Sequence, residues 1–424
     1  MSMPRTARLA AASAASAVAL ATTSLTAGAG LAAPAFAQGA AATGAAATCN
    51  APTPEPVVHV TLPGNPFTAL PTADGCWVFV AMGGPDAAMR GVAVVRRDGG
   101  KLTLQRTVPL RANGTGSTLT HDGKTLIVAA ATSVAFLDVA RLTSGAGDPV
   151  RGYLDAGEGT GVIYAGVTSD DALLFVALER AQSILVVDLR KLLAAPGTID
   201  PSAVIGRIPV GNSPVAVTPS KDGRYLYSTT QAALPAWGWP VECRPEADQS
   251  AAPNHAKGAI VVADIQRART DPANSVVART PVGCNPVRLV LTPDESTMWV
   301  STRGDHAIVA LDTKKIVSDP THAIIKQFRV GTAPVGVAVA HNGRTVIATN
   351  SNRFAGGADD RQSLNVVDAS GGPASAKLIG TIPAGAFPRE LRVSADGNTL
   401  FASNFGSRTL QVVDLGRLGA LIER

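Results

Sequence analysis

The hydrophobic and polar residues alternate in a pattern that repeats from residue 57 to the end of the chain. Each repeat contains an alternating strand, an Asp-Gly-like turn, a second apolar strand, a variable loop, a third strand that usually ends in Asp, and a fourth strand. Asp or Asn before Gly tolerates the positive φ of tight turns, so these dipeptides predict hairpins. The second strands begin at Trp77, Leu126, Leu174, Tyr225, Met298, Val346 and Leu400, and the third strands end at Asp138, Asp188, Asp264, Asp312, Asp368 and Asp414.

Seven such units begin near residues 64, 111, 159, 211, 283, 331 and 385. The spacing is 47 to 54 residues, except for 72 residues where an insertion at 231–258 lengthens the fourth unit. This period predicts an all-β fold, a seven-bladed β-propeller of four-stranded antiparallel blades that occupies residues 57–424 as one domain. The last unit ends after its third strand, while residues 57–61 form an unassigned strand. We therefore expect this N-terminal strand to complete the last blade and close the ring.

The composition agrees with a folded, exported protein. Of 424 residues, 46% are hydrophobic and 16% are charged, which excludes disordered and collagen-like chains. Residues 1–37 combine Arg5 and Arg8 with an Ala-rich, uncharged stretch and the small-x-small sequence Ala35-Phe36-Ala37, which predicts a signal peptide cleaved after Ala37. The alternative is an uncleaved membrane anchor. Residues 38–56 are rich in Ala and Pro and predict a flexible leader.

The charge balance argues against polyanionic partners. Without residues 1–37 the chain has 35 basic and 32 acidic residues, a net charge of +3, and no cluster of Lys and Arg. Nucleic-acid and anionic-lipid binding normally need such clusters. We expect a monomer in the periplasm or outside the cell, without nucleic acid and without a membrane span after signal cleavage.

The four cysteines, Cys49, Cys76, Cys243 and Cys284, form no C-x-x-C motif, which disfavours zinc, thioredoxin-type and c-type haem sites. An even number in an exported chain predicts two disulfides, with three possible connectivities. The repeat register favours Cys243–Cys284, because the insertion and the link between the fourth and fifth units lie on one face. It also favours Cys49–Cys76 near the opposite face, where the bond would fix the N-terminus.

Residues 401–415, Phe-Ala-Ser-Asn-Phe-Gly-Ser-Arg-Thr-Leu-Gln-Val-Val-Asp-Leu, and the Pro three residues into units four to seven resemble the YVTN-type, or YncE-like, β-propeller repeat family. The resemblance covers residues 57–424 and implies an exported seven-bladed propeller. Some relatives, the lactonase-type propellers, are hydrolases with His residues near the start of the first strand of a blade. This chain instead has Ala216, Arg288, Gly336 and Glu390 at those positions.

Antiparallel blades place the loops between second and third strands on the same face as the links between blades. Length variation on that loop-rich face marks it as the binding face, with neutral drift in loop length as the alternative. Two Trp in the insertion either contact a partner or carbohydrate-like ligand, or pack the insertion onto the propeller. Polar residues near the channel mouth could hold a carboxylate or phosphate, or fill the mouth with salt bridges. The candidate binding residues are Trp237, Trp239, Arg288, Arg303, His306, Asn350, Arg389, Glu390 and Asn404.

The six Asp residues at the third-strand ends recur once per unit, so we interpret them as loop caps. The six His form no metal triad by register, and the chain lacks nucleophile-elbow, EF-hand and phosphate-loop motifs, so we expect neither metal nor cofactor. The sequence favours a non-enzymatic binding or scaffold protein that engages an envelope protein, an extracellular protein or a small ligand through the loop-rich face. The alternative is a lactonase-like hydrolase or lyase acting at the channel mouth.

Overall fold

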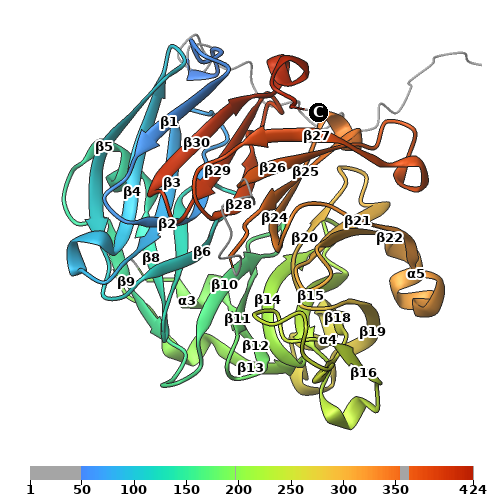
Figure 1. Cartoon of the computed structure of the whole chain (residues 1–424). Helices are drawn as coiled ribbons and strands as arrows, with labels where there is room; N and C mark the ends of the chain where they lie inside the picture. Colours follow the sequence, from blue (N-terminus) through green and yellow to red (C-terminus); the bar gives the residue numbers. More distant parts are fainter. Residues whose placement is uncertain (1–48, 196, 354–361, 424) are drawn as a thin grey trace, which may run out of the picture. The chain divides into compact units, whose positions relative to one another are not determined.

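Seven four-stranded antiparallel sheets make up the computed structural model, which describes residues 49–195, 197–353 and 362–423 (Figure 1). The predicted all-β fold with seven propeller blades is confirmed. The predicted signal peptide and residues 38–48 of the predicted leader lie outside the described residues. Within those residues, no helix is both long and apolar enough to cross a bilayer.

The blades follow one another along the chain, and each blade uses four consecutive strands apart from the insertion and the closing strand. Blade 1 contains β2 (Asn65–Pro71), β3 (Trp77–Gly83), β4 (Gly91–Asp98) and β5 (Lys101–Pro109). Blade 2 contains β6 (Gly114–Leu119), β7 (Thr125–Ala130), β8 (Ser133–Asp138) and β9 (Val150–Asp155). Blade 3 contains β10 (Val162–Val167), β11 (Leu173–Leu178), β12 (Ser183–Asp188) and β13 (Val204–Pro209). Blade 4 contains β14 (Asn212–Pro219), β15 (Tyr225–Ala232), β18 (Gly258–Asp264) and β19 (Val276–Gly283). Blade 5 contains β20 (Pro286–Leu291), β21 (Thr297–Thr302), β22 (Ala307–Asp312) and β23 (Ile324–Arg329). Blade 6 contains β24 (Pro334–Ala340), β25 (Thr345–Asn350), β26 (Ser363–Asp368) and β27 (Lys377–Pro383). Blade 7 contains β28 (Pro388–Val393), β29 (Thr399–Asn404), β30 (Thr409–Asp414) and the N-terminal strand β1 (Val57–Thr61).

The first strand of each blade lies next to the first strands of its two neighbours, from β2 through β28 and back to β2. This arrangement forms the ring visible in Figure 1. The N-terminal strand β1 pairs antiparallel with β30, with Val57 opposite Val413 and Thr61 opposite Thr409. The predicted closure of the last blade by the N-terminal strand is therefore confirmed, and it removes the open edge of β30.

The hydrophobic core lies between neighbouring blades. One cluster joins Phe136 of blade 2 to Val176 of blade 3, and another joins Val80 of blade 1 to Val412 of blade 7. The second and third strands contribute almost fully buried side chains to both of their faces, because a blade is covered on each side by its neighbours. This explains their nearly continuous apolar sequences.

The Asp that ends the third strand caps the following turn in the six blades where it occurs. Asp138, Asp188 and Asp264 accept hydrogen bonds from backbone N–H groups of α2 (Val139–Ser144), α3 (Leu189–Leu192) and α4 (Ile265–Ala268). Asp312 does the same for α5 (Thr313–Ser318), Asp414 for the 3-10 helix η8 (Leu415–Ala420), and Asp368 for the N–H of Ser370. These contacts satisfy donors that would otherwise lack partners, as expected for capping residues.

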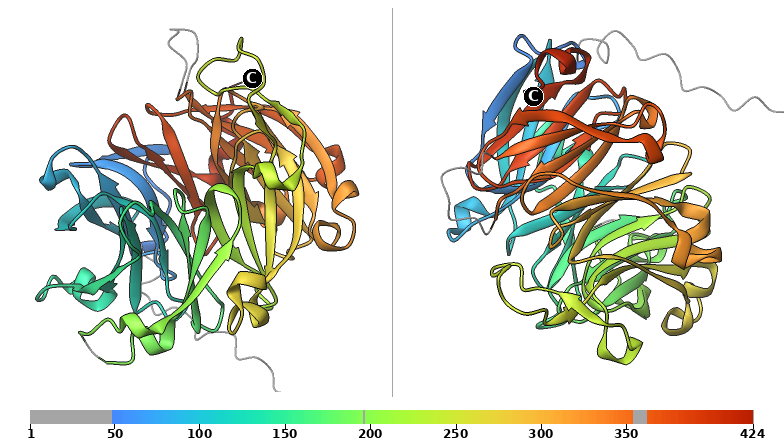
Figure 2. Two further views of the ribbon diagram at one scale, coloured as in Figure 1. Left: turned by 90° about the horizontal axis from the view of Figure 1, so that it is seen from below. Right: turned by 45° about the vertical axis from the view of Figure 1, so that its right-hand side comes forward.

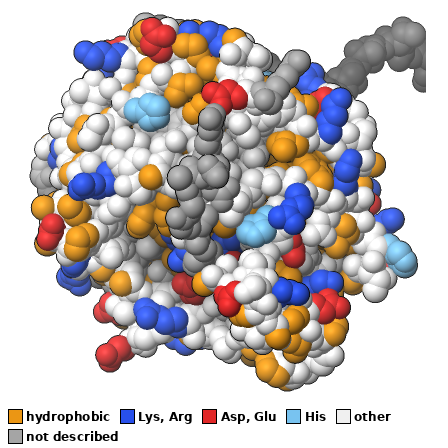
Figure 3. Space-filling model, viewed as in Figure 1, with side chains coloured by type: hydrophobic (Ala, Val, Ile, Leu, Met, Phe, Trp, Pro, Cys, Tyr) orange, Lys and Arg blue, Asp and Glu red, His pale blue; other side chains and the backbone are white. Residues whose placement is uncertain are grey.

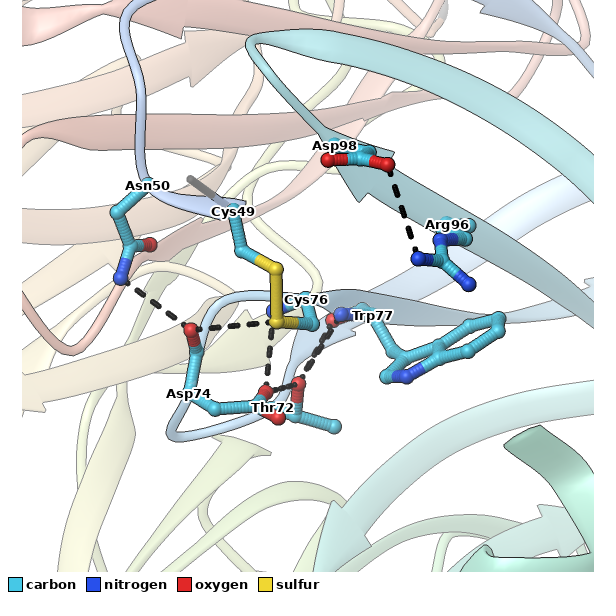
Figure 4. Close-up of a disulfide and its surroundings, with 8 residues drawn as sticks. All are labelled: Cys49, Asn50, Thr72, Asp74, Cys76, Trp77, Arg96 and Asp98. Atoms are coloured by element: carbon cyan, nitrogen blue, oxygen red, sulfur yellow. Dashed lines mark hydrogen bonds and ion pairs between the residues drawn. A yellow bond between two sulfur atoms is a disulfide. The ribbon is translucent and has the colours of Figure 1, made fainter. Parts of the chain in front are cut away.

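Residues 49–56, which the sequence assigns to the leader, lie against blades 1 and 7. The disulfide Cys49–Cys76 joins this segment to the turn after β2, with the Cα atoms 4.8 Å apart (Figure 4). Asn50 Nδ2 donates to the Asp74 carbonyl at 3.2 Å, and Arg417 donates to the Thr53 carbonyl. The second disulfide joins Cys243 to Cys284 with Cα atoms 5.6 Å apart. Both predicted connectivities are confirmed.

Candidate functional site

Buried hydroxyl groups fix the spacing of the inner strands in blades 4 to 7. Ser301 Oγ accepts from the Arg288 N–H at 3.1 Å and donates to the Val335 carbonyl of the next blade at 2.6 Å. Thr229 makes the same bridge from Ala216 to Val287, and Ser403 bridges Glu390 to the Phe67 carbonyl of blade 1. Each hydroxyl thus joins its own inner strand to the next one.

The inner strands begin with an irregular turn that places side chains at the channel mouth. Ser213, Asn285, Ala333 and Phe387 all have φ near +51° and precede a proline. The pairing with the second strand shifts register directly after that proline, as between Pro286 and Leu289 in blade 5. This bulge lets consecutive residues of the inner strand face the central channel region.

A cavity of about 300 Å³ occupies the mouth of the ring on the loop-rich face. Both apolar and polar side chains line this cavity. The apolar residues are Ile163, Val215, Val287, Val335 and Phe387, and the polar residues are Glu179, Gln231, Glu246, Arg288, Arg303, Arg353 and Arg389. Figure 3 shows that basic, acidic and hydrophobic side chains are interspersed over the face seen in Figure 1.

Arg288, which lines this cavity, forms a buried ion pair with Glu390. Arg288 Nε donates to Glu390 Oε2 at 2.5 Å, and both residues are at least 96% buried. Arg392 approaches Glu390 Oε1 at 3.6 Å and donates to the hydroxyl of Tyr164. Burial raises the pKa of Tyr164, so the phenol stays neutral at physiological pH. Arg288 also lines a second cavity of about 770 Å³ with Tyr164, Glu390 and Arg392. Arg288 therefore borders both cavities, whereas Glu390 and Arg392 border only the second.

The insertion supplies one wall of the mouth cavity. It rises from one face in the left panel of Figure 2 and contains the short hairpin β16 (Val241–Cys243) and β17 (His255–Ala256). Glu246, three residues after Cys243, accepts hydrogen bonds from Nε and Nη2 of Arg303, the latter at 2.7 Å. Arg303 Nη2 also donates to Gln231 Oε1 at 2.9 Å. The disulfide Cys243–Cys284 tethers this segment to the link before blade 5.

Arg389 differs from the other arginines of the cavity. Its guanidinium stacks on Phe67 at 3.9 Å and lies 5.4 Å from the rings of both Phe387 and Phe405. Its Nε is buried and has no hydrogen-bond partner among the described residues, which also place no carboxylate within salt-bridge distance of it. Burial, together with the nearby positive charges of Arg288, Arg353 and Arg303, lowers its pKa to about 9, although the charge of Glu390 acts in the opposite direction. Arg389 is therefore a protonated cation at neutral pH without an acidic partner in the described chain.

The other predicted binding residues lie around this cavity rather than in it. His306 borders a smaller cavity of about 190 Å³, and its Nδ1 accepts from the Ala333 N–H at 3.0 Å. Asn350 is buried at the end of β25. Asn404 is fully buried and donates to Gln411 Oε1 at 3.1 Å.

The two Trp of the insertion pack onto the propeller. Trp237 and Trp239 are partly buried against blades 3 and 4, with ring centroids 5.2 Å apart, and Arg279 stacks on Trp237 at 5.0 Å. This arrangement corresponds to the structural alternative for these residues. They hold the insertion in place, and the cavity lining does not include them.

Several lining residues were absent from the sequence-based candidates. Glu246 lies in the insertion, where no repeat register exists to place it, whereas Gln231 lies in β15 at the repeat position that Arg303 occupies in the next blade. Val215, Val287 and Val335 occupy the same position in their units, directly after the repeated Pro. The repeat therefore gave their register, but their apolar character suggested core positions. Among the described residues, no group of three or more His, Cys, Asp or Glu is placed to hold a metal ion.

Comparison with known proteins gives the fold class. No protein-family model and no curated protein sequence matches the chain. Among solved structures, Kuenenia stuttgartiensis hydrazine synthase matches with a TM-score of 0.59 and 18% identity, covering 84% of this chain and 97% of that one. A chain of the mitotic checkpoint complex matches with a TM-score of 0.60 and 14% identity, covering 85% and 94%. The β-propeller domain of Myceliophteria thermophila Cps50 (Swd1) matches with a TM-score of 0.59 and 13% identity, covering 85% and 99%. These likenesses and the seven sheets define the chain as a seven-bladed β-propeller.

Proposed function

We propose that this chain is an exported β-propeller binding protein of the YVTN type that holds a small anionic ligand at the mouth of its channel, on the loop-rich face. The observation that carries this proposal is Arg389, a largely buried cation that faces a cavity and has no acidic partner among the described residues. Burying an unpaired charge costs free energy, and an anionic ligand would offset that cost.

Export is supported by the signal-like residues 1–37 and by two disulfides, which persist in oxidising compartments. The YVTN assignment is supported by Thr229, Ser301, Thr349 and Ser403, which occupy one position of the repeat and hydrogen-bond the inner strands. The propeller neighbours are compatible with a binding scaffold, and their fold alone carries over to this chain.

The proposal is tested by thermal unfolding of the purified protein, with both disulfides formed, in the presence of phosphate, sulfate, acetate, succinate or phenylacetate. At least one of these anions should raise the melting temperature of the wild type in a concentration-dependent way and leave Arg389→Met unchanged. The matched control Arg224→Met removes an exposed Arg that stacks on Tyr225, far from the cavity lining, and should respond like the wild type. If no anion distinguishes Arg389→Met from the wild type, the proposed site is wrong.

A further inference from the structure

The charges that line the mouth cavity leave one cation for a ligand. Arg288 forms an ion pair with Glu390 and Arg303 forms one with Glu246, so both charges are compensated, although the buried Nη1 of Arg288 has no hydrogen-bond partner among the described residues. Arg353, at the rim, also has an interaction partner. Arg389 lines the cavity, its buried Nε has no hydrogen-bond partner in the described chain, and the described residues place no carboxylate within salt-bridge distance of it. The available electrostatic contact therefore fits one negative charge.

Two features of the lining disfavour a ligand with a higher charge. The carboxylates of Glu179 and Glu246 face the same cavity as Arg389, so a second negative charge would meet like charges there. One face of the Arg389 guanidinium is covered by Phe67 at 3.9 Å. The N–H groups in the guanidinium plane remain, and their planar arrangement matches a carboxylate.

The remaining wall is apolar. Val215, Val287 and Val335 come from three successive blades and form a cluster with Phe387, and Ile163 of blade 3 extends the same wall. The volume of about 300 Å³ lies at the lower end of the range for small-molecule sites. A compact ligand would therefore suit the cavity and cover these valines.

We propose that the ligand is a small monocarboxylate with a compact apolar body, whose carboxylate binds the edge of Arg389 and whose body lies against Val215, Val287 and Val335. This inference depends on the anion site proposed above and adds the chemical class. The Arg389 contact gives the charge selectivity, and the valine wall gives the selectivity for an apolar substituent.

Calorimetric titration with four probes tests the class: phenylacetate, its neutral isostere phenylacetamide, acetate and inorganic phosphate. Phenylacetate should bind the wild type at least tenfold more tightly than each of the other three. Arg389→Met should weaken phenylacetate at least tenfold, and Arg224→Met should leave it unchanged. If phosphate or acetate binds as tightly as phenylacetate but still requires Arg389, the anion site stands and the monocarboxylate assignment is overturned.

A second variant tests the apolar wall separately from the charge. Val335→Thr is nearly isosteric and adds one hydroxyl to the wall, while the Val335 carbonyl that accepts from Ser301 is retained. It should weaken phenylacetate by roughly two- to tenfold and leave acetate unchanged, because only phenylacetate has a body that contacts this wall. Equal effects on both probes, or none on phenylacetate, would contradict placement of the ligand body against the valines. Circular dichroism and melting temperature establish that each variant is folded.

Discussion

At the scale of single residues, one repeat position explains why the blades differ in their sequence regularity. Blades 4 to 7 carry Thr229, Ser301, Thr349 and Ser403 at one repeat position. Thr229, Ser301 and Ser403 bridge neighbouring inner strands, and Thr349 accepts from the Gly336 N–H of its own inner strand. By strand register, blades 1 to 3 carry Ala81, Ala129 and Ala177 at that position. At this repeat position the hydroxyl is confined to the part of the ring that carries all four arginines of the mouth cavity, Arg288, Arg303, Arg353 and Arg389.

Loss of one bridge should destabilise the protein measurably. Ser301→Ala leaves the Arg288 N–H and the Val335 carbonyl without this partner in a fully buried setting, and we expect a loss of about 1–3 kcal/mol in the free energy of unfolding. Ser301→Thr should stay within about 1 kcal/mol of the wild type, because Thr occupies the same position in blades 4 and 6. Urea unfolding measures both variants, and equal losses would show that packing rather than the hydroxyl dominates.

Removal of the unpaired cation should have the opposite effect on stability. The lowered pKa of Arg389 means that its charged form is less favourable in the folded protein than in the unfolded chain. Arg389→Met should therefore stabilise the ligand-free protein by about 1–2 kcal/mol, after loss of the contact with Phe67 is included. Arg288→Met, which leaves Glu390 with a single, more distant Arg, should instead destabilise it by about 3 kcal/mol. Urea unfolding in buffer free of carboxylates compares the two, and a destabilised Arg389→Met would argue that this charge already has a partner.

At the scale of elements, the turns between first and second strands share a hydroxyl-to-carboxylate contact. Thr120, Thr168, Ser220, Thr292 and Ser394 donate to the Asp two residues later at 2.5–2.6 Å. In the Thr292 turn the hydroxyl and the Ser296 groups lower the pKa of Asp294 to about 2. The pKa of Asp170 is also lowered, first by its Thr168 hydroxyl. These contacts stabilise the turns that join the first and second strands of each blade.

The lowered pKa values predict loss of stability in acid. A carboxyl group whose pKa is lower in the folded state binds fewer protons there than in the unfolded state, so its contribution is present above about pH 4 and disappears as the pH falls towards about 2. Urea unfolding should show a steep fall in stability between these values. Thr292→Val removes the first cause of the Asp294 shift and should make that fall shallower, whereas a slope unchanged by Thr292→Val would assign the acid sensitivity to other groups.

The sequence predicted the elements well because they are local and repeated. Asp-Gly turns, apolar second strands and the six capping Asp residues follow from short-range chemistry, and the disulfides follow from the register of the units. The mouth cavity was predicted only in part. Arg288, Arg303 and Arg389 lie on or directly after regular strands, whereas Glu246 lies in an insertion without any period. The aromatic contacts of Arg389 with Phe67 and Phe387 join blade 1 to blade 7, and only ring closure brings these residues together.

At the scale of the whole molecule, the ring is closed without a covalent bond across the last blade. β1 pairs with β30 over five residue pairs, and Arg417 holds the preceding segment through the Thr53 carbonyl. The Cys49–Cys76 disulfide provides the covalent tie between this segment and blade 1. Because Phe67 of blade 1 stacks on Arg389 of blade 7, the same closure completes the proposed ligand site.

Removal of this disulfide should therefore loosen the closure before it unfolds the blades. In Cys49→Ser with Cys76→Ser, we expect a loss of about 2–4 kcal/mol in global stability, as for a disulfide that spans 27 residues. Amide hydrogen exchange in residues 57–61 should speed up more than exchange in β21, which lies in blade 5. The matched pair Cys243→Ser with Cys284→Ser removes the other disulfide, whose 41-residue span predicts a similar global loss, but it should leave the relative exchange of β1 unchanged. Equal acceleration of β1 and β21 in the first pair would mean that closure and blades unfold as a single unit, in which case the N-terminal strand is as firmly held by its pairing with β30 as any strand inside a blade.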